Sequence, residues 1–242
     1  MTRHFVTIIA AAMLISSAAA AQTIYPIDRA EMVAGAKFDL KVEFDGEVAA
    51  GNASLTINGT DAATLFGKAP ELIAREDGKP QSALLLRELT LPAGHYQVQA
   101  SDGSSQQSVR WTVYDTAPRR AKNVILFIGD GLSPAHRIAA RLLSKGIREG
   151  KSLGKLAIDD MPQMALVATA GSDSIITDSA NAASAYATGH KTAVNAMGVY
   201  ADRSVSPFDD PKVETIAELA KRRLGLAIGI VTNTEIEDAT PS

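Results

Sequence analysis

Apolar and polar residues alternate with a period of two in the first part of the chain. In residues 38–44, apolar side chains at the even positions alternate with charged side chains at the odd positions. This alternation predicts a strand with one buried face. It recurs around Leu55, near residues 84–86 and 96–98, and at 109–113, with turn signals at 58–59 and 92–94. We therefore predict a small all-β, immunoglobulin-like sandwich over residues 22–117.

Continuous apolar runs replace the alternation from residue 123 onward. Residues 124–128, 162–169 and 226–231 are typical of strands buried on both faces of a parallel sheet. Between them, the pattern predicts helices at 134–144, 179–188 and 212–224, the last with Ile216, Leu219 and Ala220 facing inward. We expect an α/β domain over 123–242 and a linker at 118–122, where Pro118 precedes the basic cluster of Arg119, Arg120 and Lys122.

The first 21 residues have the pattern of a secretory signal peptide. A short basic start precedes an apolar run at 5–15, and Ala19 to Ala21 match a small-residue cleavage site. The run is too short to span a bilayer. The sequence therefore predicts a periplasmic or secreted protein without stable membrane insertion.

Composition narrows the chemistry. The 242 residues have a net charge of -3, so no basic excess favours a nucleic-acid partner. The chain contains no cysteine, which excludes disulfides and thiolate metal sites. Any metal must bind carboxylate, hydroxyl or imidazole groups.

Three polar positions follow predicted strands or begin a predicted helix, where ligands of α/β proteins bind. Asp130 stands between two glycines after the run 124–128 and is a candidate ligand for Zn²⁺ or Mg²⁺, or a loop carboxylate that satisfies its own turn. Ser179 begins an alanine-rich helix, where the helix dipole favours phosphate, with Asp178 beside it. The alternative is a plain helix cap.

The third position is the pair Asp238 and Thr240. Two residues apart on an extended segment, their side chains point to the same side and offer the oxygen ligands that suit Mg²⁺. The alternative is an ordinary acidic loop, because Glu235 and Glu237 lie alongside.

Three stretches in this order resemble the alkaline phosphatase family. They are Asn-Val-Ile-Leu-Phe-Ile-Gly-Asp-Gly at 123–131, Ile-Thr-Asp-Ser-Ala-Asn-Ala-Ala-Ser-Ala-Tyr-Ala-Thr-Gly-His-Lys-Thr at 176–192 and Asp-Ala-Thr-Pro at 238–241. The resemblance implies that Asp130 bridges the second zinc and the magnesium. It further implies that Ser179 is the phosphorylated nucleophile and contacts that zinc, that Asp178 supports it, that Thr240 binds magnesium, and that Asp238 acts through a magnesium-bound water.

The resemblance implies an enzyme that cleaves phosphate monoesters with Zn²⁺ and Mg²⁺, and it allows a homodimer. The family's further zinc ligands have no counterpart in this sequence, so we expect an incomplete C-terminal part and an inactive chain. Two other functions remain open. One is a phosphodiesterase of the same superfamily, with Thr177 as a possible nucleophile; the other is a non-catalytic exported binding module.

Overall fold

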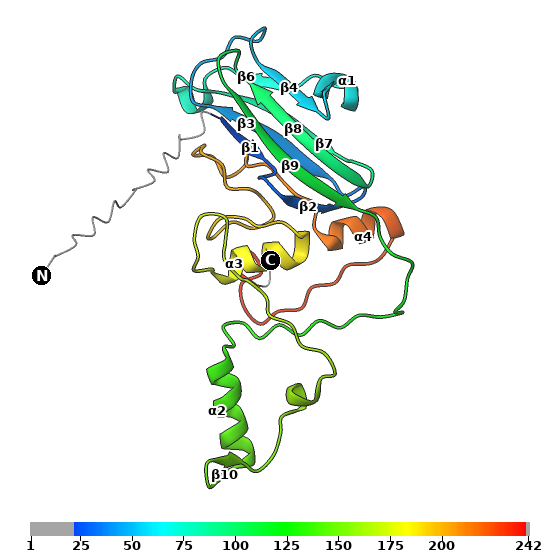
Figure 1. Ribbon diagram of the computed structural model, residues 1–242, viewed down its shortest axis with the longest axis vertical. Coiled ribbons are helices and arrows are strands. Elements are labelled where there is room, and N and C mark those ends of the chain that lie inside the picture. The colour runs from blue at the N-terminus through cyan, green and yellow to red at the C-terminus, as the bar shows by residue number, and fades with distance from the viewer. Residues whose placement is uncertain (1–21, 241–242) are drawn as a thin grey trace, which may run out of the picture.

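The N-terminal part of the protein is a sandwich of two sheets. The computed structural model describes residues 22–240, so the predicted signal peptide lies outside the described residues. One sheet has the order β1-β3-β7-β6 and the other β2-β9-β8-β4-β5 (Figure 1). The strands span, in chain order, Gln22–Tyr25, Ala30–Val33, Phe38–Phe44, Ser54–Ile57, Thr60–Asp61, Glu71–Ile73, Ser82–Leu89, Gly94–Ser101 and Gln106–Tyr114, and the short helix α1 spans Ala62–Phe66.

The strand order matches that of immunoglobulin-type sandwiches. With the short β2 and β5 set aside, the first, second, fifth and fourth strands form one sheet and the third, sixth and seventh form the other. Tyr96, near the start of β8, donates its hydroxyl hydrogen to the carbonyl of Pro92 at 2.8 Å, as in the tyrosine corner of such domains. Turn chemistry is also as predicted, because Asn58 and Gly59 both have positive φ between β4 and β5.

The core of the sandwich lies between the two sheets. Trp111 of β9 is almost fully buried, meets Phe38 edge to face at 5.5 Å, and donates from Nε1 to the carbonyl of Pro26. Leu40 and Val42 of β3 face the same core with no exposed surface. Burial of such side chains stabilises the folded state by about 2 kcal/mol each.

The expectation of one exposed face is wrong for β3. All seven of its residues are buried, including Asp39, Lys41 and Glu43. Residues 199–214 cover this second face, and Val213 of this segment forms a bridge with Phe38 of β3. The alternation of apolar and polar residues is a local signal. It cannot show that a segment more than 150 residues later in the sequence covers the polar face of β3.

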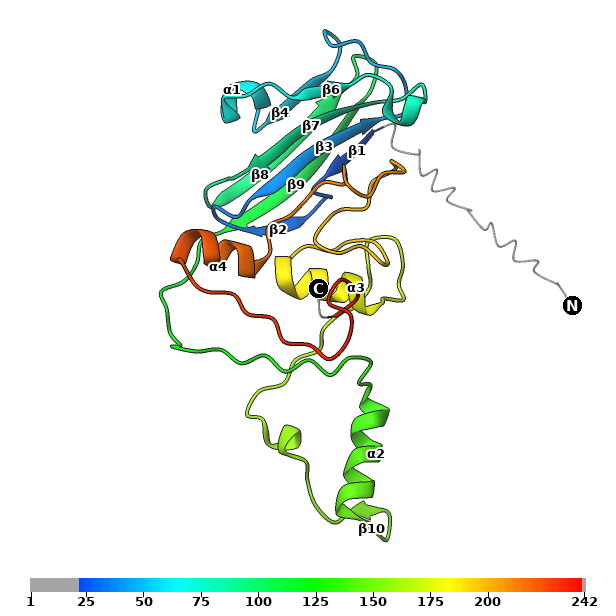
Figure 2. The ribbon, with the colours of Figure 1, turned by 180° about the vertical axis from the view of Figure 1, so that it is seen from behind.

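The rest of the chain forms helices joined by long irregular segments (Figures 1 and 2). Helix α2 spans Pro134–Lys145, α3 spans Ser179–Thr188 and α4 spans Ile216–Leu224. The two-residue strands β10, Ile147–Arg148, and β11, Lys151–Ser152, form a hairpin after α2. Short 3₁₀ turns lie at Glu76–Gly78 and Ala157–Asp160. In both views α3 and α4 lie below the sandwich, and the C-terminal segment passes beside α3.

The predicted parallel sheet is absent from the described residues. Segments 124–128, 162–169 and 226–231 contain no strand. Their apolar side chains face solvent, with Phe127 87% exposed and Leu166 99% exposed. A strand needs hydrogen-bonding neighbours on its edges, and no described segment pairs with these three. Mixed helices and sheets are therefore present, but not in the predicted parallel arrangement.

Helix α4 begins later than predicted. Residues 212–213 instead take part in bridges to Val199 and Phe38, so the helix starts at Ile216 after the cap Thr215. Ile216 is exposed rather than inward-facing.

The division of the chain at 118–122 stays a prediction. Within residues 22–240, the structure has no helix that is long and apolar enough to cross a membrane.

Candidate active site

Asp130 lies in a tight turn at residues 129–132. The amide of Leu132 donates to the carbonyl of Gly129 at 3.0 Å, and Gly131 has a φ of 64°. A Cβ on Gly129 would lie 2.8 Å from the Cβ of Leu132, so a larger residue there would displace the turn. The two glycines therefore let the chain turn sharply and leave the Asp130 carboxylate exposed.

Thr240 meets Asp130 in space. Its Oγ1 donates to Oδ2 of Asp130 at 2.9 Å, although the two residues are 110 positions apart. The structure thus brings together two of the predicted magnesium ligands. Their roles as ligands stay a prediction.

Tyr186 of α3 lies beside this pair and was missed by the sequence interpretation. Burial raises the pKa of its hydroxyl, the charge of Asp130 raises it further, and a hydrogen bond with Thr240 opposes both effects. Tyr186 follows Ser179 by seven residues, which places the two on the same face of the helix about 10 Å apart along its axis. The periodicity of the helix was the signal that could have identified Tyr186.

Ser179 is the first residue of α3, and its hydroxyl has no partner in the part of the chain that the structure describes. The cap is Asp178, whose Oδ1 accepts from the amide of Asn181 at 2.9 Å and whose Oδ2 accepts from the amide of Asn195 at 2.7 Å. Among the described residues, none forms a hydrogen bond with the side chain of Ser179. The capping role thus falls to Asp178, which leaves the Ser179 hydroxyl at the positive end of the helix dipole. The structure shows no contact between Ser179 and Asp130 or Thr240.

Thr177 differs from Ser179 in this respect. Its Oγ1 donates to Oδ1 of Asn181 at 2.5 Å, and the same oxygen of Asn181 accepts from the amide of Asp178. The Thr177 hydroxyl is therefore engaged in the network that caps the helix.

Asp238 forms no hydrogen bond with the other predicted ligands among the described residues. Its carboxylate is exposed and makes no hydrogen bond or ion pair with the described residues. The expected extended geometry between Asp238 and Thr240 is wrong, because Ala239 has a φ of 58° and the chain turns there. The sequence could not show this, since alanine seldom adopts a left-handed conformation.

A second acidic cluster lies on the outer face of β3. Carboxylate oxygens of Glu43, Glu76 and Asp202 lie within 4.8 Å of one another. Lys41 contacts Glu76 at 2.7 Å and also pairs with Asp202, while Arg203 contacts Glu76 at 2.8 Å. The buried Lys41 and the half-buried Arg203 already compensate these carboxylates, so this cluster is a structural ion network and not a metal site. Burial raises the pKa of Glu43.

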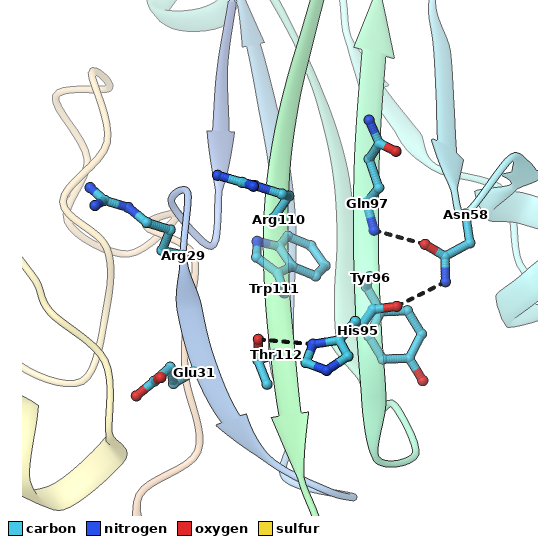
Figure 3. A pocket seen from close by; sticks show the side chains of 9 residues that line it. All are labelled: Arg29, Glu31, Asn58, His95, Tyr96, Gln97, Arg110, Trp111 and Thr112. Carbon is cyan, nitrogen blue, oxygen red and sulfur yellow. Dashed lines mark hydrogen bonds between the residues drawn. The ribbon is translucent and has the colours of Figure 1, made fainter.

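A polar groove of about 620 Å³ lies on the outer face of the sheet that contains β2, β8 and β9 (Figure 3). His95 lines it, and its Nδ1 lies 3.3 Å from Oγ1 of Thr112. Asn58 fixes one wall by accepting from the amide of Gln97 and donating to the carbonyl of His95. Neither Asp130 nor Ser179 lines this groove, so it is separate from the candidate active site.

Comparison with known proteins shows the family. The alkaline phosphatase family model matches residues 121–242, half of the chain, and this chain belongs to that family. The alkaline phosphatase of Escherichia coli (strain K12) is 33% identical over 181 residues, which cover 72% of this chain and 34% of that protein. Alkaline phosphatase 4 of Drosophila melanogaster is 34% identical over 133 residues, 53% of this chain and 22% of that protein.

A third relative bears a more specific name. Streptomycin-6-phosphate phosphatase of Streptomyces griseus is 36% identical over 132 residues, 52% of this chain and 27% of that protein. The chain thus spans between about a fifth and a third of the length of these curated relatives.

Proposed function

We propose that the family region of this chain serves a phosphomonoester hydrolase in which Ser179 is the nucleophile. The observation that carries the proposal is the Ser179 hydroxyl at the start of α3, which has no partner among the described residues and lies on the same helix face as Tyr186. Tyr186 in turn lies beside the Asp130–Thr240 pair. Helix starts favour bound phosphate, because their unpaired amides and the dipole attract negative charge. Membership of the family supplies the reaction class.

The chemistry of the donor set fits Mg²⁺. Asp130 and Thr240 offer a carboxylate and a hydroxyl oxygen 2.9 Å apart on an exposed surface, and Mg²⁺ prefers such oxygen ligands. In the proposed site Asp130 and Thr240 would hold magnesium, and Asp238 would act through a water bound to it. Asp130 and Ser179 would also be ligands for zinc. The metals, when bound, stabilise the charges on the attacking and leaving oxygens.

The chain's own residues perform the displacement. The Oγ of Ser179 attacks phosphorus, the bond to the alcohol oxygen breaks, and the alcohol leaves with a proton. Water then attacks the phosphoserine, which restores the Ser179 hydroxyl and releases inorganic phosphate. Asp178 holds the start of the helix through its two amide hydrogen bonds, so that the Ser179 Oγ keeps its direction.

Serine is a better candidate than the neighbouring threonine. The Thr177 hydroxyl donates to Asn181, whereas that of Ser179 has no partner among the described residues. This difference favours a monoesterase with a serine nucleophile over a threonine-dependent phosphodiesterase. Export to the periplasm or medium and assembly as a homodimer remain parts of the proposal.

Titration calorimetry tests the site in the chain itself. We expect Mg²⁺ binding that Asp130→Asn weakens about tenfold or more and Thr240→Val also weakens, since each removes an oxygen ligand. Inorganic phosphate should bind to the Mg²⁺-loaded chain. Asp115→Asn is the matched control, because this exposed carboxylate bonds only to the next amide.

Two results would overturn the proposal. The first is that the chain binds neither Mg²⁺ nor phosphate, as expected of a pure binding module. The second is that Asp130→Asn binds Mg²⁺ as well as the wild type does. Hydrolysis of a chromogenic monoester is a separate readout, and we expect no zinc-dependent turnover from this chain. Robust turnover that Ser179→Ala abolishes would confirm the nucleophile and contradict that expectation.

A further inference from the structure

The segment after α3 folds back along the helix that it follows. The amide of Gly198 donates to Oγ of Ser184 at 2.8 Å, and this oxygen donates to the carbonyl of Ala196 at 3.0 Å. At the start of the helix, the amide of Asn195 donates to Oδ2 of Asp178 at 2.7 Å. Residues 190–200, here called the return loop, thus extend from the end of the helix back to its start.

A buried side-chain pair closes the base of the return loop. Nδ1 of His190 lies 2.6 Å from the hydroxyl of Tyr200, and the two rings meet edge to face at 5.6 Å. His190 is only 6% exposed and Tyr200 2%. Oγ1 of Thr192 adds a second link by donating to the carbonyl of Val199 at 2.5 Å. The first and last residues of the loop are therefore joined in a buried site.

The base of the return loop is also anchored in the sandwich. Tyr200 belongs to the main hydrophobic core and packs against Tyr25 of β1 with ring centroids 5.7 Å apart. Its amide donates to the carbonyl of Pro211, next to the residues that pair with β3. The sandwich thus contacts the loop that caps the start of α3.

We propose that His190 and Tyr200 are positioning residues for Ser179, acting through the return loop. This inference rests on the proposed function and deepens it. The pair closes the loop, the closed loop presents the amide of Asn195 to Asp178, and Asp178 fixes the helix start that carries Ser179. The immunoglobulin-like sandwich then forms part of the support of the active site and is not an independent module.

The physical reason lies in the burial of the pair. In Tyr200→Phe the buried imidazole of His190 loses its hydroxyl partner, and in His190→Leu the hydroxyl hydrogen of Tyr200 loses Nδ1, although the Tyr200 oxygen keeps a bond with the backbone of Ile27. Either loss leaves an unsatisfied polar group in a site of low dielectric. The loop can satisfy that group only by opening toward water, which withdraws Asn195 from Asp178. Loss of one buried hydrogen bond should therefore be detected at the helix start, beyond the site of the substitution.

Four variants test the proposal in the full chain. Tyr200→Phe removes the hydroxyl and keeps the ring, and His190→Leu removes the polar atom. His190→Asn is the conservative variant, because the amide group of asparagine can place a polar atom near the position of Nδ1. Tyr114→Phe is the matched control, since that hydroxyl donates to Glu31 at the surface.

Amide hydrogen exchange is the primary readout. We expect the amides of Asn195 and Asn181 to exchange about tenfold faster in Tyr200→Phe and His190→Leu, with the amides of β3 unchanged. His190→Asn should restore most of the protection, and Tyr114→Phe should match the wild type. Equal acceleration at all amides, or unchanged exchange at Asn195 and Asn181, would overturn the proposal.

Phosphate affinity of the Mg²⁺-loaded chain is the second readout. Tyr200→Phe should weaken phosphate binding several-fold and leave Mg²⁺ binding unchanged, because Asp130 and Thr240 lie outside the loop. If the wild type binds no phosphate, the proposed function fails, while the exchange data still decide whether the loop fixes the helix start.

Discussion

The sandwich and the family region both contain apolar segments. Those of the sandwich are buried, whereas three segments of the family region are exposed. Leu40 of β3 has no exposed surface, whereas Leu166 is 99% exposed. Each strand of the sandwich pairs with neighbours in a sheet, while segments 124–128, 162–169 and 226–231 pair with nothing in the described residues. The difference therefore lies in the partners available to each segment and not in its own hydrophobicity.

One part of the family region behaves like the sandwich. Residues 199–214 bury Tyr200 and Val213 in the sandwich core and place Asp202 and Arg203 in its ion network. Strand β3 pairs with this segment through Phe38, and its charged side chains Lys41 and Glu43 bind Asp202 and Arg203. Apolar content alone therefore does not decide burial, and a complementary surface within reach does.

The ion network should give the largest effect. Lys41→Met would leave Asp202 buried without its cation and Glu76 with Arg203 alone, so we expect the free energy of unfolding to fall by about 3–5 kcal/mol. Urea unfolding measures this as a lower midpoint. Lys155→Met is the control, because the Lys155–Asp160 pair is exposed and its loss should have no measurable effect. Equal midpoints for both variants would contradict the interpretation.

The same substitution in each region gives the most direct comparison. Leu40→Ala should lower the free energy of unfolding by about 2–5 kcal/mol, because it opens a cavity between the sheets. Leu166→Ala should change it by less than about 0.5 kcal/mol, because that side chain is already in water. Urea unfolding of both variants measures the contrast. Comparable losses would show that Leu166 is buried in solution and would remove the difference between the regions.

His190 should link the stability of the return loop to pH. Burial lowers the pKa of its imidazole from 6.5 to about 4. The unfolded chain therefore takes up a proton more readily, so the contribution of His190 is complete above about pH 6.5 and is lost as the pH falls to about 4. The loss is roughly 3 kcal/mol.

The pH dependence of urea unfolding, measured for the wild type and for His190→Asn, checks this prediction. Burial raises the pKa of Glu43 and Asp210, which also titrate at acid pH. Their effect is common to both proteins and cancels in the difference. Parallel pH profiles would show that His190 is not held neutral.

The cap of α3 should give the smallest effect. Asp178→Ala removes the acceptor for the amides of Asn181 and Asn195, and we expect a loss of about 1 kcal/mol in urea unfolding. Asp178→Asn should lose less, because its one amide oxygen can still cap the amide of Asn181, while its NH2 group cannot accept from the amide of Asn195. A loss as large as that of Lys41→Met would mean that the cap supports much more than the helix start.

Local signals in the sequence predicted many elements correctly. Helix α3 begins and ends at the predicted residues, helix α2 begins at the predicted Pro134, and the turn at Asn58 and Gly59 lies between two strands. Each depends on side chains within a few residues of one another. The bend at Ala239, the position of Tyr186 beside the Asp130–Thr240 pair and the late start of α4 depend on contacts with distant segments, which periodicity does not report.

The candidate site divides in the same way. The order of motifs placed Asp130, Ser179 and Thr240 in one region, and the meeting of Asp130 and Thr240 across 110 positions agrees with that expectation. The structure shows that Asp178 and Thr177 form the hydrogen bonds of the helix cap, whereas the Ser179 hydroxyl has no partner among the described residues. The sequence offers all three side chains as candidates, and hydrogen bonding distinguishes between them.

By itself the sequence determined the family, the sandwich pattern and the local starts and ends of helices, because these depend on residue order and short-range chemistry. Only the tertiary structure decided which faces are buried, that residues 199–214 cover β3, and that His190 joins Tyr200. Such outcomes depend on which surfaces meet, and the free energy of burial comes from both partners and not from either segment alone.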